Sequence, residues 1–156
     1  METTKEDYRV ITDKKQLSVE AIHKMLKNES YWARNRSLEQ VSKSIERSLC
    51  FGLFHRNNQI GFARVVTDGV TMFYLCDVII TEKYRGKGLG KVLMDAVFSS
   101  GEIQGLFGML MTKDAHGLYR KYDFKGCEEC QERFMILGSG WRQKGVQPSR
   151  HILQAI

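Results

Sequence analysis

The sequence lacks the features that identify membrane and secreted proteins. None of its apolar runs approaches the about 20 residues that a membrane-spanning helix needs. Residues 1–7 have no apolar core of the kind found in signal peptides. We therefore expect a cytoplasmic protein without a membrane partner. The 42% hydrophobic and 27% charged content is that of a folded chain, and 156 residues without a visible repeat predict one domain, 1–156.

Cysteine is also scarce, and its spacing argues against two kinds of site. Four cysteines would form a disulfide framework only in a small secreted chain. Cys127 and Cys130 have the spacing of a metal-ligand pair, but no second Cys or His pair follows at the distance of a zinc site. We predict that the protein holds no metal.

Dense basic segments are missing as well, although the net charge is +6. Lysine and arginine are scattered, and no cluster of five or more occurs, which argues against nucleic acid as a partner. The excess of positive charge still favours an anionic ligand of some kind.

The periodicity of the apolar residues predicts a mixed sheet flanked by helices. Ser18 has the position of a helix N-cap, and Ser37 with Gln40 has the spacing of a capping box. The predicted strands are 8–11, 50–54, 60–67, 70–80, 106–111 and 133–137, and the predicted helices begin near residues 18, 37, 89 and 114.

Residues 85–91 carry the clearest functional pattern in the chain. Glycine occupies positions 86, 88 and 90, directly after an apolar strand and directly before an amphipathic helix. Glycine lets a ligand approach the main chain closely, and amides at the start of a helix form a site for anions. Arg85 and Lys87 add positive charge. The segment therefore predicts a phosphate-bearing ligand that is held mainly by backbone groups.

Two well-known phosphate loops do not fit this segment. A Walker A loop has glycine where Arg85 stands and serine or threonine where Val92 stands. The dinucleotide fingerprint fits Gly86 and Gly88, but Lys91 replaces its last glycine. Both patterns fail at residues that carry their chemistry.

The pattern R-x-x-G-x-G, from Arg85 to Gly90, resembles the pyrophosphate loop of the GNAT acetyltransferase superfamily, which binds acetyl-coenzyme A. Upstream, 77–80 is similar to the fourth strand of that family. Downstream, 112–115 and 118–124 resemble the segment that ends in its L-Y-x-K-x-G-F signature. The likeness is clearest over 60–124, and the tail 138–156 has no assigned role.

This resemblance implies an α+β fold, with a mostly antiparallel twisted sheet of six to seven strands and about four helices. It also implies that acetyl-CoA is the co-substrate. Asp114 stands where the family usually has an asparagine that contacts the cofactor. Asp123 replaces the usual glycine before Phe124, and aspartate tolerates a left-handed backbone conformation better than most residues. The implied cofactor-binding residues are Val78, Ile79, Ile80, Arg85, Gly86, Lys87, Gly88, Leu89, Gly90, Lys91 and Asp114.

Two residues are candidates for the chemistry. Tyr119 matches the family tyrosine that protonates the departing coenzyme A sulfur, or else it is an aromatic side chain on the buried face of its helix. Asp77 lies inside an otherwise apolar strand, where an unpaired charge would cost several kcal/mol. It is a general base, an anchor for a cationic acceptor, or a structural carboxylate bonded to nearby backbone.

The acceptor side is less specific. Tyr31 and Trp32 either wall a substrate pocket or cover the core, and Arg64 has the same two interpretations. We predict an N-acetyltransferase that transfers acetyl directly, in a ternary complex, to a primary amine of a small molecule or peptide. The alternative is a non-catalytic CoA-binding module on the same fold. The apolar end of the tail offers a surface for a homodimer.

Overall fold

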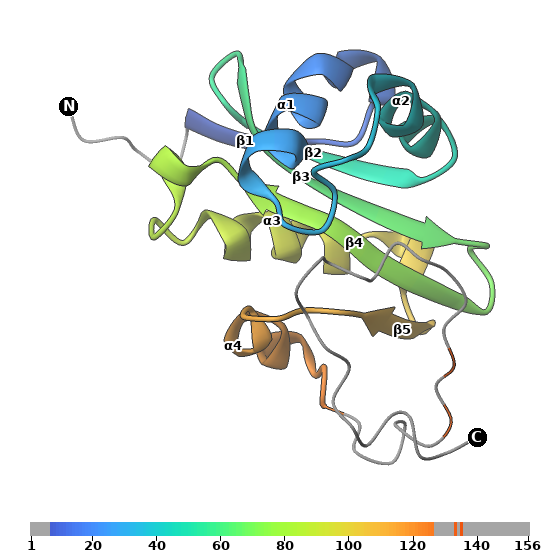
Figure 1. Cartoon of the computed structure of the whole chain (residues 1–156). Helices are drawn as coiled ribbons and strands as arrows, with labels where there is room; N and C mark the ends of the chain where they lie inside the picture. Colours follow the sequence, from blue (N-terminus) through green and yellow to red (C-terminus); the bar gives the residue numbers. More distant parts are fainter. Residues whose placement is uncertain (1–6, 127–132, 134, 136–156) are drawn as a thin grey trace, which may run out of the picture. The chain divides into compact units, whose positions relative to one another are not determined.

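Five strands form one sheet in the order β1 to β5 (Figure 1). The computed structural model describes residues 7–126, 133 and 135. Residues 1–124 form one unit and 125–156 another, and the sheet belongs to the first. Neighbouring strands are antiparallel from β1 to β4, whereas β5 is parallel to β4. The strands are β1 (Tyr8–Ile11), β2 (Leu49–His55), β3 (Asn58–Thr67), β4 (Met72–Ile80) and β5 (Phe107–Leu110).

The helices begin where the sequence predicts them. Ser18 accepts a hydrogen bond from the amide of Ala21, and Ser37 and Gln40 form the expected capping box. The α-helices are α1 (Val19–Glu29), α2 (Leu38–Glu46), α3 (Leu89–Phe98) and α4 (His116–Tyr119). Short 3-10 helices at Glu82–Tyr84 and Arg120–Tyr122 precede α3 and follow α4. Asp123 adopts the left-handed conformation expected of it, with φ 64°.

Each face of the sheet has its own hydrophobic core, because α1 and α2 cover one face and α3 covers the other (Figure 1). The central strands β2 and β3 contribute buried side chains to both. The core on the α3 face includes Leu53, Val65, Leu75, Leu93 and Val97. The core on the α1/α2 face includes Ile22, Met25, Val41, Phe62 and Ile79.

A β-bulge interrupts β4 at Asp77. Cys76 pairs with Arg64 of β3 and Ile79 pairs with Phe62, so β4 has one extra residue across this interval. Asp77 itself has φ 52°, a value that is uncommon outside glycine. An extra residue reverses the alternation of side chains along a strand. The bulge therefore decides which face each later residue of β4 occupies.

The packing of β4 shows this reversal. Phe73 and Leu75, before the bulge, lie in the core on the α3 face. Ile79 lies an even number of positions after Phe73 and Leu75, so strict alternation would place it on the same face. It lies instead in the core on the α1/α2 face. Asp77 points its carboxylate to that second face, toward residues from the loop between α1 and α2.

The last five residues of β4 have a free edge. β5 pairs with β4 only from Met72 to Leu75. Beyond this point the chain runs from β5 toward α4 (Figure 1), and within the described residues 76–80 have a neighbouring strand on the β3 side alone. Their backbone groups on the other side are open to a ligand, apart from the carbonyl oxygen of Ile80, which accepts from Arg85 Nε.

Some predictions about the fold were wrong in detail. The described residues form five strands rather than six to seven. The interval between the predicted strands 50–54 and 60–67 is shorter than expected, a two-residue turn, since β2 continues to His55 and β3 begins at Asn58. Apart from residues 133 and 135, the predicted strand 133–137, the Cys127–Cys130 pair and the tail 138–156 lie outside the described residues. Across 7–126, no helix has the length and apolar character required to cross a bilayer.

Candidate functional site

The glycine loop has the conformation that its sequence requires. Gly86 has φ 74° and Gly88 has φ 75°, in the left-handed region that glycine enters without strain. Gly88 is the N-cap of α3 and has no side chain to cap the helix. Glycine at these two positions is therefore a requirement of the backbone.

The same loop presents free amide groups. The amides of Lys91 and Val92 donate to the carbonyl oxygen of Gly88, but those of residues 86–90 have no acceptor in the described part of the chain. The first turn of α3 also contains no acidic side chain. Free amides at the positive end of a helix dipole are groups that favour an anion, so the loop has the features on which the predicted anion site depends.

The basic side chains of the loop are held by the protein itself. Arg85 Nε donates to the carbonyl oxygen of Ile80 (2.8 Å), and its NH2 group donates to Glu29 Oε2 (3.2 Å). The same oxygen of Glu29 accepts from the amide of Glu82 (2.7 Å). Lys91 Nζ forms an exposed ion pair with Asp95 (2.6 Å). Arg85 thus ties the loop to β4 and α1, which gives it a positioning role.

Tyr119 lies in α4 and is buried, with 8% of its surface exposed. Its hydroxyl group forms no hydrogen bond with any described residue. Burial raises the pKa of Tyr119 to about 12, with smaller contributions from Asp114 and Tyr31, so that the hydroxyl remains protonated at neutral pH. A Cβ atom at Gly90 would lie 3.7 Å from Leu118 Cδ2, which places α4 against the start of α3.

The carboxylate of Asp77 is engaged by three side chains. Oδ2 accepts from Arg36 NH1 (2.7 Å) and from Arg64 Nε (2.8 Å), and Oδ1 accepts from Trp32 Nε1 (3.2 Å). Arg64 also donates from NH1 to Ser48 Oγ (3.0 Å). Trp32 and Arg36 come from the α1–α2 loop and Arg64 from β3, while Ser48 directly precedes β2. We call Asp77, Arg36, Arg64 and Trp32 the Asp77 cluster.

Electrostatics favour a structural role for Asp77 over a general base. Burial alone would raise its pKa, but the charges and hydrogen bonds of Arg64 and Arg36 outweigh burial and hold the pKa below its usual range. A carboxylate stabilised in this way is a weak proton acceptor at neutral pH. Its partners are side chains, and not the nearby backbone that one interpretation of the sequence proposed.

Sequence reasoning identified Arg64 and Trp32 but missed Arg36 and Ser48. The signal for Arg36 was a basic residue in a short loop that also holds two aromatic residues. Tyr31 packs edge-to-face on Trp32, with 4.9 Å between ring centroids, and Lys113 Nζ lies 5.7 Å from the Tyr31 ring. Since Tyr31 also contributes to the pKa of Tyr119, this loop lies near α4.

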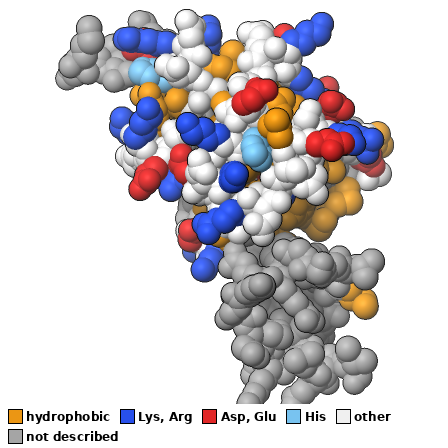
Figure 2. All heavy atoms as spheres, turned by 45° about the horizontal axis from the view of Figure 1, so that its top comes forward, with side chains coloured by type: hydrophobic (Ala, Val, Ile, Leu, Met, Phe, Trp, Pro, Cys, Tyr) orange, Lys and Arg blue, Asp and Glu red, His pale blue; other side chains and the backbone are white. Residues whose placement is uncertain are grey.

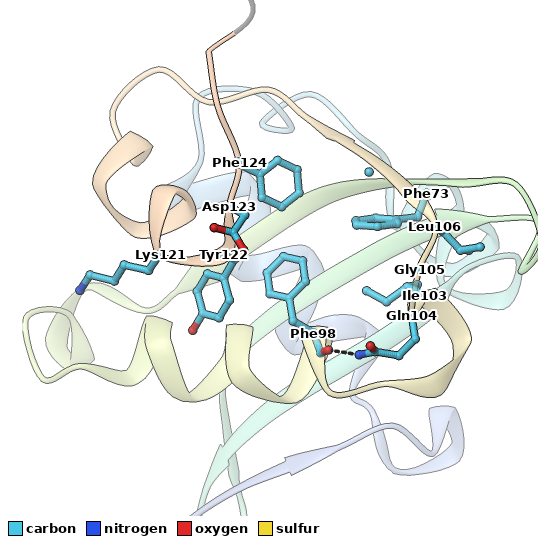
Figure 3. A pocket seen from close by; sticks show the side chains of 11 residues that line it. Phe73, Phe98, Ile103, Gln104, Gly105, Leu106, Lys121, Tyr122, Asp123 and Phe124 are labelled. Atoms are coloured by element: carbon cyan, nitrogen blue, oxygen red, sulfur yellow. Dashed lines mark hydrogen bonds between the residues drawn. The ribbon is translucent and has the colours of Figure 1, made fainter.

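A separate cavity lies at the other end of α3 (Figure 3). It has a volume of about 550 Å³ and is lined by Phe73, Phe98, Tyr122 and Phe124 among others. None of the predicted site residues lines it. The free β4 edge, the glycine loop and Tyr119 are therefore a better candidate site than this hollow.

The outer surface gives no sign of a nucleic-acid interface on the face shown in Figure 2. Lysine and arginine side chains are interspersed there with acidic and apolar ones. Among the described residues, no three His, Cys, Asp or Glu side chains converge as metal ligands would.

Comparison with known proteins identifies the family. A model of the acetyltransferase (GNAT) domain matches residues 46–126, which is more than half of the chain. The chain belongs to the GNAT acetyltransferase family. The GNAT model includes β4, the glycine loop and α4, so the match covers the candidate site.

Relatives of this GNAT protein support the assignment. A crystal structure from Xanthomonas campestris, assigned to the GNAT family, is 39% identical and has a TM-score of 0.81, covering 85% of this chain and 94% of that one. A Gibberella zeae protein named as a candidate acetyltransferase is 30% identical, covering 76% of this chain and 78% of the relative. A Clostridium acetobutylicum structure with acetyl-CoA shares the fold at 16% identity and TM-score 0.62, covering 84% of this chain and 94% of that one.

Proposed function

We propose that this GNAT acetyltransferase binds acetyl-CoA and transfers the acetyl group directly to a primary amine within a ternary complex. The observation that carries the proposal is the continuity of three features. The free edge of β4 leads into the glycine loop, and Tyr119 belongs to α4, which packs through Leu118 against the start of α3. A long ligand with an anionic end and a reactive end fits such a path.

We assign the cofactor residues from the family resemblance together with this geometry. The free amides of 86–90 would hold the pyrophosphate, whereas the predicted contribution of the Lys91 amide is excluded by its hydrogen bond to Gly88. The backbone of Val78, Ile79 and Ile80 would bind the pantetheine arm as a strand binds its neighbour. Acetyl-CoA in the related Clostridium acetobutylicum structure supports this choice of ligand. Arg85 contributes by fixing the loop, and Asp114 by its effect on Tyr119.

Acyl transfer would proceed with a balanced exchange of protons. The amine nitrogen forms a bond to the acetyl carbon while the carbon–sulfur bond breaks. The amides of Val78 or Ile79 stabilise the negative charge on the carbonyl oxygen. Tyr119 donates its proton to the departing thiolate, and the proton lost by the amine returns through solvent to Tyr119. Asp77 acts in this scheme as a positioning residue for Arg36 and Arg64.

The decisive experiment measures thiol release from acetyl-CoA in the presence of a broad panel of amines. Release that depends on an amine, with an acetylated product found by mass spectrometry, is the expected result. Binding of acetyl-CoA without acetylation of any amine would favour the alternative of a CoA-binding module. No calorimetric binding of acetyl-CoA would contradict both.

Substitution of Gly88 with alanine is expected to weaken acetyl-CoA binding by roughly ten-fold or more. A Cβ atom at φ 75° costs about 1–2 kcal/mol, and relief of that strain turns the loop amides away from the ligand. Isothermal titration measures the effect. Gly69→Ala is a matched control, since Gly69 has φ 73° and equally open surroundings but lies in the turn between β3 and β4. Equal affinity in both variants would contradict the assignment of the loop.

A further inference from the structure

The Asp77 cluster contains more positive than negative charge. Two guanidinium groups share a single carboxylate, and both use the same oxygen, Oδ2. The side chain of Asp77 is 1% exposed, that of Arg64 13% and that of Arg36 32%. The excess positive charge is therefore located on the part of the cluster that solvent and ligands can reach.

Neighbouring titratable groups do not neutralise this excess. Burial raises the pKa of Cys76 to about 12 and that of Cys50 to about 11, so both thiols stay protonated at neutral pH. Burial also raises the pKa of Tyr74, which stays neutral. These three groups interact electrostatically with Arg64, and none of them carries a negative charge that would offset the arginines at neutral pH.

Arg36 retains donors for a ligand. Its guanidinium group donates from NH1 to Asp77, and neither Nε nor NH2 has a partner in the described part of the chain. A guanidinium group carries five N–H donors in a planar arrangement that matches a carboxylate. Asp77 holds this group in place, which lowers the entropy that a ligand must remove on binding.

The cluster adjoins the reaction path. Asp77 directly precedes Val78 and Ile79, one of whose amides is proposed above to stabilise the carbonyl oxygen of the thioester. Trp32 donates to Asp77, and Tyr31 packs on Trp32 and contributes to the pKa of Tyr119. Tyr31 and Trp32 are 42% and 41% exposed and pack on each other, so they form a continuous aromatic surface.

We propose that the acetyl acceptor is a free amino acid whose carboxylate binds Arg36 and whose apolar side chain packs against Tyr31 and Trp32. This inference rests on the proposed acetyltransferase function. Arg64 supports the site by sharing Asp77 with Arg36. The primary amine of the acceptor lies next to the carboxylate that Arg36 holds, and so reaches the acetyl group at Val78 and Ile79.

The test compares L-phenylalanine, L-phenylalaninamide and phenethylamine in the thiol-release assay. These probes share a side chain and differ in the carboxylate. Because the amine of the amide is less basic, chemistry alone favours the amide, and a preference for the acid must come from binding. We expect kcat/KM to be at least ten-fold higher for phenylalanine. Acetylation of amines without any preference for a carboxylate overturns this inference and leaves the proposed function intact, whereas no acetylation of any amine overturns both.

Variants of Arg36 test whether this residue causes the preference for an acceptor with a carboxylate. Arg36→Gln is expected to raise KM for phenylalanine about ten-fold with little change in kcat, and to leave KM for phenethylamine unchanged. Arg36→Lys restores part of the preference, since it keeps the charge without the planar pair of donors. Arg34→Gln removes an exposed charge from the same loop and should behave as wild type. The ratio of the two substrates is measured within each variant, so partial unfolding does not affect it. An unchanged ratio in Arg36→Gln would falsify the assignment.

Discussion

Replacing Asp77 with alanine will lower the free energy of unfolding by about 3–5 kcal/mol. The substitution leaves Arg36 and Arg64 partly buried without their shared carboxylate, and it also removes the acceptor of Trp32. Unpaired buried charge is among the most destabilising defects in a protein. Urea denaturation followed by tryptophan fluorescence measures the change, because Trp32 itself reports on the cluster.

An exposed carboxylate provides the comparison. Glu39 forms an ion pair with Lys43 on the surface of α2, and Glu39→Ala should cost no more than about 1 kcal/mol. Asp77→Asn keeps the shape of the side chain and one acceptor oxygen. The free energy of unfolding that it loses should therefore lie between the losses of Asp77→Ala and Glu39→Ala. A loss of less than about 1 kcal/mol in Asp77→Ala would show that the cluster is dispensable for folding.

The same ion pairs make stability depend on pH. Arg64 and Arg36 hold the pKa of Asp77 below its unfolded value of about 3.9. Above that pH, the ion pairs of Asp77 therefore make their full contribution to the free energy of unfolding. The contribution disappears as the pH falls through the lower, folded pKa. Between about pH 5 and about pH 2, wild type should therefore lose more free energy of unfolding than Asp77→Asn. Equal losses would mean that Asp77 is not paired in solution.

Tyr119→Phe should reduce kcat by about 10²-fold or more while the Kd for acetyl-CoA stays within about two-fold. The variant removes the proposed proton donor and keeps the ring that packs against Phe124. Steady-state kinetics with a good acceptor and isothermal titration separate the two quantities.

Tyr122→Phe is the matched control for this prediction. The hydroxyl of Tyr122 donates to Asp95 Oδ1 (2.7 Å) and to the carbonyl oxygen of Lys91 (3.2 Å), so its loss affects packing on α3. We expect slightly lower stability and nearly normal kcat. If Tyr119→Phe turned over as fast as Tyr122→Phe, another group would have to protonate the thiolate.

Local signals in the sequence account for most of the fold. Ser18, Ser37 and Gln40 mark helix starts through short-range hydrogen bonds, and these were confirmed. The sequence also indicated a backbone turn at Gly86 and Gly88, and both have a positive φ, which leaves few alternatives to glycine. Such features depend on residues within a few positions of one another.

Features that depend on how the strands pair with one another could not be predicted from the sequence. The apolar run that becomes β4 gives no sign of the bulge at Asp77, because the extra residue exists only relative to β3. The partners of Asp77 lie 45, 41 and 13 positions earlier, in segments whose placement the tertiary structure decides. The role of Asp77 therefore stayed undecided until its neighbours were known.

The ion pair between Arg85 and Glu29 joins the glycine loop to the end of α1. Glu29 is the last residue of α1, and the loop with Tyr31 and Trp32 follows it directly, so one helix end supports both the coenzyme loop and the acceptor loop. If the proposed donor and acceptor sites are correct, this shared support gives them a route for thermodynamic linkage, and by reciprocity each ligand would change the affinity of the other by the same factor.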